Sequence, residues 1–351
     1  TKNVSDTRIA RLEDSLESCH EIRAMNNFIK YTLLTHGIQL VHTRPTQLLV
    51  LDLCSGRGGD LMKMKHLNGS QSPCAARAYF RGVLCIDGSL LSLGTAACRY
   101  SVTPGLSVNS TKKNHSDRRS QRPIGIPLRF IHADCFSVRL QSAYQEFLQD
   151  VGGSTSAQFD IVSIQFALHY AFVSEDKLRT LLKNVTSHLR SGGVLIATFV
   201  DEQQILNKME KGREWKSSKE TCMINMDTSD SSSVYERSYF FHLGDVVNGE
   251  REYLVNLNHF MSIAAEFGLS TQLLCHSFQE LFDGAMSGTH PSTHAPHQKF
   301  PLMADKFPHF WPSLKRKASA EEGNGIRKWA EIPLETQEVC GLYKGIILRK
   351  A

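Results

Sequence analysis

The sequence predicts an α/β protein built on a mostly parallel, twisted sheet with helices on both faces. Two observations lead to this prediction. Short, continuous apolar runs, typical of strands that are buried on both sides, alternate with segments of helical spacing. The first run leads through a glycine-rich turn, CSGRGGD, into the helical pattern LMKMKHL. Strands that alternate with helices form parallel βαβ units, whose right-handed crossovers place helices on both sides of a doubly wound sheet.

The individual elements follow from the spacing of apolar residues. Near-helical spacing predicts leading helices over residues 6–35. Continuous apolar runs predict five buried strands, at Leu48–Leu53, Gly82–Asp87, Leu128–Ala133, Phe159–Phe166 and Val194–Phe199. Helical segments are expected between or after them, near 89–99, 139–149, 175–189 and 201–211. The closing segment Gly341–Lys350 returns to strand character, and we expect it to complete the sheet.

We expect a single domain over residues 1–351, with N-terminal helices at 1–45, a cofactor-binding core at 46–215 and a sheet-closing part at 234–351. Segments rich in Ser, Pro, Gly and His indicate surface insertions at about 101–127, 216–233 and 284–325. The last insertion contains three histidines between prolines without a fixed ligand framework, so we expect a solvated loop and no metal site at His290, His294 and His297.

The first insertion carries a concentrated positive segment: Lys112, Lys113, His115, Arg118, Arg119 and Arg122. It would attract phosphates if it lay near a binding cleft, and the alternative is a solvated loop without a partner. The whole chain of 351 residues has a formal net charge of +5, which does not separate an RNA enzyme from a small-molecule enzyme.

Composition narrows the class of protein in two further ways. No apolar run approaches the roughly 20 residues of a membrane span, so we expect an intracellular protein without a membrane partner. The nine cysteines contain no C-x-x-C pair and stand mostly in apolar segments. They are therefore expected to be free thiols that bind no zinc and form no disulfides.

The glycine-rich turn predicts a cofactor site. A strand ending near Asp52, a turn with glycines and a following helix let backbone approach a nucleotide-like ligand. Asp87, at the end of the second strand, can accept hydrogen bonds from both ribose hydroxyls, and Asp134, after the third, can meet an adenine. NAD is the rival cofactor, but the turn lacks the G-x-G-x-x-G pattern that suits a pyrophosphate. S-adenosylmethionine has no phosphate and tolerates an acidic edge; a tight turn without a ligand is the remaining alternative.

Several segments together resemble the eukaryotic and viral mRNA cap guanine-N7 methyltransferases. The resemblance runs from about residue 22 to the end apart from the insertions, and its segments are NNFIK (Asn26–Lys30), VLDLCSGRGGDLMK (Val50–Lys63), FDIVSIQFALHYAF (Phe159–Phe172), LRSGGVLIATF (Leu189–Phe199), EYLVNL (Glu252–Leu257) and GLYKGIILRK (Gly341–Lys350). The glycine loop alone is typical of any class I methyltransferase, whereas the HY-containing strand end with NNFIK upstream is more specific. The resemblance implies a Rossmann-like, class I S-adenosylmethionine-dependent RNA methyltransferase that acts on capped RNA. It also implies a nuclear location, or a cytoplasmic one if the chain is viral, with other capping-enzyme domains or subunits as further partners.

The resemblance also implies roles for individual residues. Contacts to S-adenosylmethionine are expected at Lys30, Gly56, Asp87, Asp134 and Gln165. Contacts to the cap are expected at Asn26, Arg57, Arg99, His169, Tyr170, Glu252 and Tyr343, so that 234–351 would also be the cap-binding part. The chain departs from the family in having Cys54 and Ser55 where Gly-Cys is usual, which would crowd the methionine portion of the cofactor if the backbone followed the usual path.

The expected chemistry needs alignment more than acid–base catalysis. Guanine N7 has an in-plane lone pair and loses no proton before it attacks a sulfonium methyl group, so no general base is expected. His169, Tyr170 and Glu252 would position the guanine, while Arg57 and Arg99 would hold the triphosphate. Simpler explanations remain, since His169 and Tyr170 can end a core strand and Glu252 can pair with a neighbouring arginine. Alternative functions are a methyltransferase for another RNA or a small molecule, and a cap-binding module whose cofactor site has decayed.

Overall fold

The computed structural model describes residues 2–41, 47–68, 79–102, 125–152, 156–209, 212–227, 233–244, 246–292, 299–311 and 328–351, with side-chain surroundings from residue 17 onward. The positive segment between Lys112 and Arg122 lies outside the described residues, as do His294 and His297. In the described part of the chain, no helix is long and apolar enough to cross a membrane. Nor do three or more potential metal ligands come together there.

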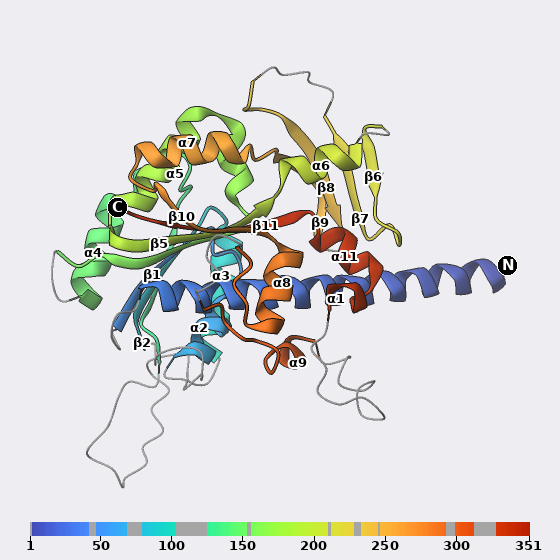
Figure 1. Cartoon of the computed structure of the whole chain (residues 1–351), viewed down its shortest axis with the longest axis horizontal. Helices are drawn as coiled ribbons and strands as arrows, with labels where there is room; N and C mark the ends of the chain where they lie inside the picture. Colours follow the sequence, from blue (N-terminus) through green and yellow to red (C-terminus); the bar gives the residue numbers. More distant parts are fainter. Residues whose placement is uncertain are drawn as a thin grey trace, which may run out of the picture.

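Seven strands in the described residues form the main sheet, in the order β10-β11-β5-β4-β1-β2-β3 (Figure 1). Their bounds are β1 Gln47–Leu53, β2 Tyr79–Asp87, β3 Leu128–His132, β4 Phe159–Gln165, β5 Leu189–Val200, β10 Thr271–Ser277 and β11 Tyr343–Arg349. The five predicted strands and the closing strand are confirmed. Strand β11 runs antiparallel to both of its neighbours, while the pairings among β1 to β5 are parallel.

Helices cover both faces of this sheet, as the alternation of elements predicted (Figure 1). One face packs against α1 (Lys2–Val41), α2 (Leu61–Leu67) and α8 (Phe278–Ser287), and the other against α4 (Gln141–Gly152), α5 (Glu175–Thr186) and α7 (Leu257–Glu266). Neighbouring residues of β1 show the two faces, because Val50 belongs to the first core and Leu51 to the second. The leading segment forms one continuous helix, α1, whose first part projects from the body (Figure 1), where separate helices were expected.

The surface insertion expected at 216–233 contains, in its described part, a strand of a second, antiparallel sheet, so the expectation is wrong there; residues 228–232 lie outside the described residues. This second sheet consists, in the described residues, of β6 (Glu214–Lys216), β7 (Cys222–Met226), β8 (Ser238–Leu243) and β9 (Val247–Tyr253). Cys222 and Ile224 on β7 are fully buried, so this stretch alternates between core and surface despite its polar neighbours. The helix α11 (Leu334–Cys340) supports it, because the buried Glu335 accepts hydrogen bonds from Ser217 and from the backbone N–H of Thr221.

The expected insertion at 284–325 is also corrected in its described parts. Helix α8 continues to Ser287 and ends at Gly288, which has φ +73°. A short helix α9 (Phe307–Phe310) follows, and large apolar side chains are buried on the way: Phe300, Met303, Phe307 and Trp311. His290, expected in a solvated loop, is only 4% exposed, and its ring packs against those of His36 and Phe300. The Pro- and His-rich composition did not predict that these side chains are buried, because their burial depends on residues that are distant in the sequence.

The remaining elements of the described residues are α3 (Leu90–Val102), the short 3-10 helix η1 (Leu168–Val173), α6 (Glu202–Met209) and η2 (Trp329–Glu331). No disulfide joins the cysteines of the described residues. The strand order reverses direction between β1 and β4, since β2 and β3 lie on one side of β1 and β5 on the other. Ligands of open α/β sheets bind at such a switch point, outside the carboxyl ends of the strands.

Candidate functional site

The glycine loop, residues 54–60, follows β1 and is tied to the end of β2. The Ser55 N–H donates to the Ile86 carbonyl at 3.0 Å, and the Gly56 N–H donates to Asp87 Oδ2 at 2.7 Å. Gly56 and Gly58 both have positive φ, +55° and +70°. A Cβ on Gly58 would lie 2.9 Å from the Cβ of Ala96, whereas no described atom would lie within 4 Å of a Cβ on Gly56. Glycine is therefore needed at 58 for the close approach of α3, and the loop is open at 56.

Cys54, where the family usually has glycine, adopts φ +58° and turns its side chain inward. Its Sγ lies 3.6 Å from Cys135 Sγ, and the side chain packs against the core on the α4 and α5 side of the sheet. The strained backbone thus directs this thiol toward Cys135. Whether Cys54 crowds the methionine portion of the cofactor depends on the direction of its side chain, which here points to Cys135.

Asp87 and Asp134 stand after neighbouring strands at the same sheet edge. Besides the bond from Gly56, Asp87 accepts the N–H of Ser89 at 2.8 Å through Oδ1. Each carboxylate oxygen has two acceptor sites, so both can still accept a hydroxyl. Asp134 accepts hydrogen bonds from the Phe136 N–H and the Ser137 hydroxyl. Partial burial raises the pKa of Asp134, but these bonds outweigh it and the net pKa is lowered.

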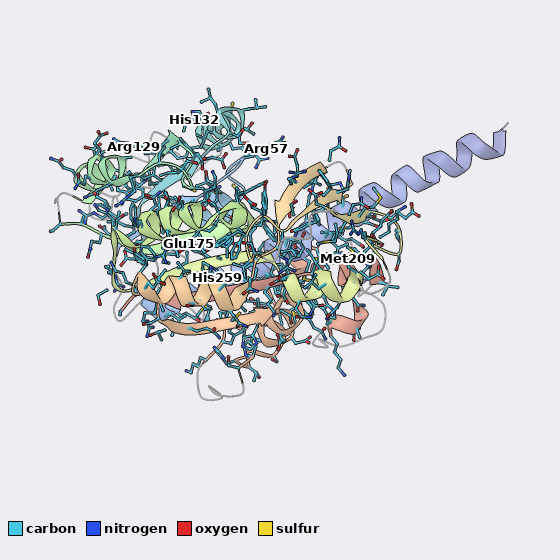
Figure 2. The ribbon with its side chains drawn as sticks, turned by 90° about the horizontal axis from the view of Figure 1, so that it is seen from above. Arg57, Arg129, His132, Glu175, Met209 and His259 are labelled. Atoms are coloured by element: carbon cyan, nitrogen blue, oxygen red, sulfur yellow. The ribbon has the colours of Figure 1, made fainter. Side chains whose placement is uncertain are left out.

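Arg57 and Arg99 form an exposed basic pair beside the glycine loop. Arg99 Nη1 donates to the Arg57 carbonyl at 3.1 Å, which links the start of the loop to α3. Figure 2 shows the Arg57 side chain at the molecular surface. Both predicted phosphate contacts are therefore next to each other, with guanidinium groups that reach solvent.

A buried charged cluster lies under the loop, and the sequence reasoning missed most of it. Asp60 pairs with both Lys30 and Lys63 at 2.8 Å, and Lys63 also donates to Asn27 at 2.8 Å. Burial lowers the pKa of Lys63 to about 8. Burial alone would raise the pKa of Asp60, but the two ammonium groups hold it well below its usual range. Asp52, nearby, is 1% exposed, and burial raises its pKa.

Gln165, at the end of β4, lines the same small cavity as Lys30, Asp60 and Lys63. Its side chain donates to Ser163 and accepts from Thr198, so its orientation is set by two neighbouring strands. The next residue, Phe166, has φ +54°, an uncommon value for a non-glycine residue. Its N–H bonds to Thr198, and the Lys30 ammonium lies 5.8 Å from its ring centroid. The strained turn thereby redirects the chain from β4 into η1.

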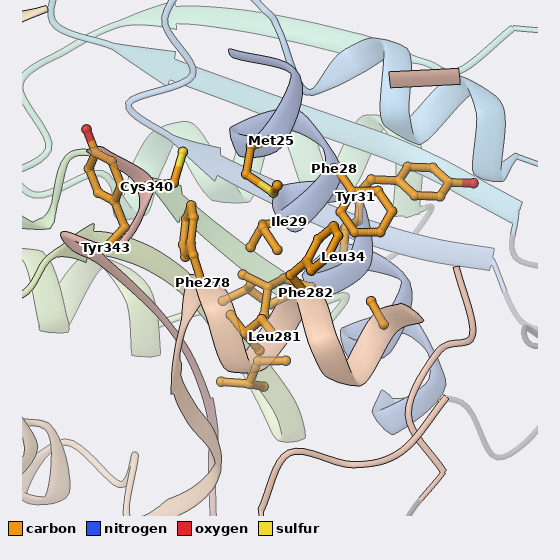
Figure 3. Packing of buried hydrophobic residues seen from close by; sticks show 14 of the residues in the cluster. Met25, Phe28, Ile29, Tyr31, Leu34, Phe278, Leu281, Phe282, Cys340 and Tyr343 are labelled. Atoms are coloured by element: carbon orange, nitrogen blue, oxygen red, sulfur yellow. The ribbon is translucent and has the colours of Figure 1, made fainter. Parts of the chain in front are cut away.

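Tyr343 and Asn26 approach this edge from β11 and α1. Tyr343 is 4% exposed, its ring lies 5.0 Å from that of Phe166, and burial raises its pKa. Figure 3 shows its hydroxyl pointing away from the apolar contacts between α1 and α8. Asn26 Oδ1 lies 3.6 Å from Cys340 Sγ, at the end of α11 just before β11. Asn26 and Tyr343, the two predicted cap contacts, therefore lie at the same edge as the glycine loop and pack against protein.

His169, Tyr170 and Glu252 come together from η1 and the second sheet. Glu252 is 7% exposed, and its Oε1 lies 3.8 Å from His169 Nε2. Burial raises the pKa of Glu252 to about 7, although the Tyr239 hydroxyl, which donates to Oε2 at 2.7 Å, lowers it. Burial lowers the pKa of His169 to about 3, so the imidazole is neutral and the contact is no ion pair at neutral pH.

The simpler explanation for Glu252, a pairing with a neighbouring arginine, is wrong. Arg251 pairs with Asp227 and Arg237 with Glu202, so neither arginine neutralises Glu252. Both ring nitrogens of His169 lack a hydrogen-bond partner among the described residues. Buried polar atoms are nearly always satisfied, so both nitrogens are available to a further hydrogen-bond partner.

The structure thus gathers the predicted positions along one edge of the sheet. Several of them lie at the carboxyl ends of four parallel strands: Gly56 after β1, Asp87 as the last residue of β2, Asp134 after β3, Gln165 as the last residue of β4 and His169 just beyond it. Glu252 comes from the second sheet, which the sequence reasoning did not foresee. Four contributors were missed: Asn27, Asp60, Lys63 and Tyr239. Asn27, Asp60 and Lys63 lie inside the NNFIK and GGDLMK segments, so their position in these motifs could have indicated a role in the site. Tyr239 has the pattern of an ordinary core residue of a strand, and the sequence offered no such indication for it.

Comparison with known proteins identifies the family. The sequence pattern of the mRNA (guanine-N(7))-methyltransferase domain matches residues 5–348. The mRNA cap guanine-N(7) methyltransferase 1 of Arabidopsis thaliana is 28% identical over 99% of this chain and 81% of its own length. The mRNA cap guanine-N(7) methyltransferase of Schizosaccharomyces pombe is 30% identical over 71% of this chain and 59% of its own length. This chain therefore spans most of the plant protein and little more than half of the yeast protein.

Two solved structures show lower sequence identity. A S-adenosylmethionine-dependent methyltransferase from Clostridium acetobutylicum is 12% identical, with a TM-score of 0.46 over 92% of each chain. The CcbJ methyltransferase of Streptomyces caelestis is 10% identical, with a TM-score of 0.47 over 93% of this chain and 96% of that one. The assignment follows from the sequence match, and the seven-stranded sheet described above agrees with a Rossmann-like, class I methyltransferase fold. Because the domain pattern spans nearly the whole sequence, the chain belongs to the mRNA (guanine-N7)-methyltransferase family, which acts on capped RNA with S-adenosylmethionine as methyl donor.

Proposed function

We propose that this chain methylates guanine N7 of the mRNA cap by in-line displacement, without a general base. One observation carries the proposal: a buried, unneutralised carboxylate and a neutral histidine, Glu252 and His169, lie at the sheet edge that also holds the glycine loop. N7 attacks with a free lone pair, so no side chain has to remove a proton. Alignment is then the main contribution, worth up to about 7–11 kcal/mol in favourable cases.

The residues of the loop fit S-adenosylmethionine, which supplies a methyl group activated by a sulfonium. Asp52 Oδ2 is buried without a hydrogen-bond partner among the described residues, next to the Lys30 and Lys63 ammonium groups. This mixed-charge surrounding suits an amino acid portion that carries both an ammonium and a carboxylate. In this proposal Lys30, Gly56 and Gln165 contact the methionine side, Asp87 accepts the ribose hydroxyls, and Asp134 meets the adenine.

The cap contacts are proposed on the other side of the loop. Glu252 accepts hydrogen bonds from guanine N1–H and the exocyclic amine, and these bonds strengthen as the ring becomes cationic. His169 and Tyr170 position the base beside that carboxylate, with their ring centroids 4.1 Å apart. Arg57 and Arg99 hold the triphosphate through their planar guanidinium groups. Asn26 and Tyr343 complete the pocket from α1 and β11.

The test is transfer of a labelled methyl group to unmethylated capped RNA, followed by digestion that locates the methyl group on the guanine. We expect Asp87→Ala to abolish S-adenosylmethionine binding in calorimetry. We expect Glu252→Ala to bind the cofactor normally and to lose turnover. Label on another RNA or on a small molecule, with none on the cap, would contradict the proposal. So would an absence of binding heat in the wild-type chain, which would indicate a decayed cofactor site.

The wider setting is proposed from the same family relationship. Residues 46–215 would hold the cofactor and 234–351 would bind the cap and close the sheet, with residues 1–45 supplying Asn26 and Lys30. Other capping-enzyme domains or subunits are proposed partners, to be sought by affinity purification of the tagged chain. A nuclear location is proposed from the eukaryotic relatives, with the cytoplasm as the alternative for a viral chain; imaging of a fluorescent fusion decides between them.

A further inference from the structure

We propose that Tyr239 is a positioning residue that holds the Glu252 carboxylate in the orientation that receives the guanine edge. This inference rests on the proposed function of Glu252. Tyr239 is fully buried, and its hydroxyl donates to Glu252 Oε2 at 2.7 Å. The two residues are direct cross-strand partners, Tyr239 on β8 and Glu252 on β9. The contact is therefore part of the register of the second sheet, which fixes both side chains on one face.

The hydrogen bond from Tyr239 makes the surroundings of the two Glu252 carboxylate oxygens different. Oε2 is occupied by Tyr239, while Oε1 lies 3.8 Å from His169 Nε2, beyond hydrogen-bond distance. A guanine edge presents two adjacent N–H donors and needs a carboxylate plane that is already aligned. A glutamate side chain that is anchored before the ligand arrives loses less conformational freedom on binding. Tyr239 thus prepares Glu252 without touching the substrate.

The charges around Glu252 make this hydrogen bond more important. The negative charge of Glu250, on the same strand, disfavours a second negative charge on Glu252 and raises the pKa of Glu252. The other titratable groups that face Glu252 are neutral at pH 7: His169 and Tyr170 from η1, Tyr239 from β8, Cys222 from β7 and Tyr343 from β11. The Tyr239 hydroxyl is the contact that lowers the pKa of Glu252 against the effect of burial. Its removal should raise that pKa further.

The variant Tyr239→Phe removes only the hydroxyl and keeps the ring, which packs near Phe241. We expect kcat/KM for capped RNA at neutral pH to fall about 10- to 100-fold, the range for a hydrogen bond to a charged group. The pH at which kcat/KM is half-maximal should move upward. The affinity for S-adenosylmethionine, measured by calorimetry, should stay unchanged. Tyr144→Phe is the matched control, because Tyr144 is equally buried on α4 and its hydroxyl has no hydrogen-bond partner among the described residues.

A second comparison separates positioning from a general structural role. In a Glu252→Gln background, which should keep a measurable rate, Tyr239→Phe should lower kcat/KM by a smaller factor than in the wild type, because the charge-assisted hydrogen bond to the carboxylate is already gone. An unchanged rate and pH profile in the folded single variant would overturn the inference, as would equal losses in the wild-type and Glu252→Gln backgrounds. If the wild-type chain methylates no cap, the proposed function fails and this inference fails with it. If the wild type is active and Tyr239→Phe behaves like Tyr144→Phe, the inference alone fails.

Discussion

Replacement of Glu252 by glutamine tests the centre of the proposed site. The side chain keeps its shape but loses its charge, and its new amide N–H₂ would face donors of the guanine edge. Loss of one partner from a buried, charge-assisted contact costs about 2–5 kcal/mol. Since about 1.4 kcal/mol corresponds to a factor of ten, kcat/KM should fall by about 30-fold or more. Binding of S-adenosylmethionine should stay normal, because the predicted cofactor contacts lie elsewhere.

The pH dependence gives a second, independent signature. Burial raises the pKa of Glu252 from 4.5 to about 7, so the carboxylate exists above that pH and is lost as the pH falls through it. The ionised fraction should drop from about nine tenths near pH 8 to about one tenth near pH 6, and kcat/KM with it by about tenfold. His169, with a pKa of about 3, does not titrate in this range.

The assay is the initial rate of methyl transfer to capped RNA at low substrate concentration across this pH range. In the glutamine variant, the acidic limb should be absent, because no carboxylate titrates there. A flat wild-type profile between about pH 6 and about pH 8 would refute the reasoning. The same conclusion would follow if the variant retained the wild-type limb, since another group would then be responsible.

Three further outcomes follow from the structure. Gly58→Ala should lower the free energy of unfolding by about 1–3 kcal/mol, because residue 58 has a positive φ and closely contacts α3. Gly94→Ala, at an exposed position of α3, should be neutral or stabilising by up to about 1 kcal/mol. Similar urea midpoints for the two variants would contradict this expectation. Asp60→Ala removes the carboxylate partner of the buried Lys63 and the partly buried Lys30 and should cost about 3–5 kcal/mol. Asp150→Ala, in an exposed pair, should cost less than about 1 kcal/mol by the same measurement. Arg99→Ala should raise KM for capped RNA, reduce its salt dependence and leave kcat nearly unchanged; an equal salt dependence in wild type and variant would count against phosphate contact.

The sequence by itself determined the parallel sheet and half of the candidate site. A strand buried on both faces needs a continuous apolar run, so β1, β2, β4 and β5 were visible from local composition alone. The glycine loop was equally readable, because a positive φ at Gly58 is a local requirement. Since parallel strands end at one edge, Asp87 and Gln165 could be expected there without any knowledge of distant contacts.

Only the tertiary structure decided which polar side chains become buried and paired. Tyr239 meets Glu252 through the register of β8 and β9, and Lys30 meets Asp60 through the packing of α1 against the loop. His290, in a segment whose composition is that of a surface loop, is buried by the ring of His36. These outcomes depend on residues far apart in the chain. The burial and pairing of these polar side chains are set by their three-dimensional neighbours, which local spacing does not reveal.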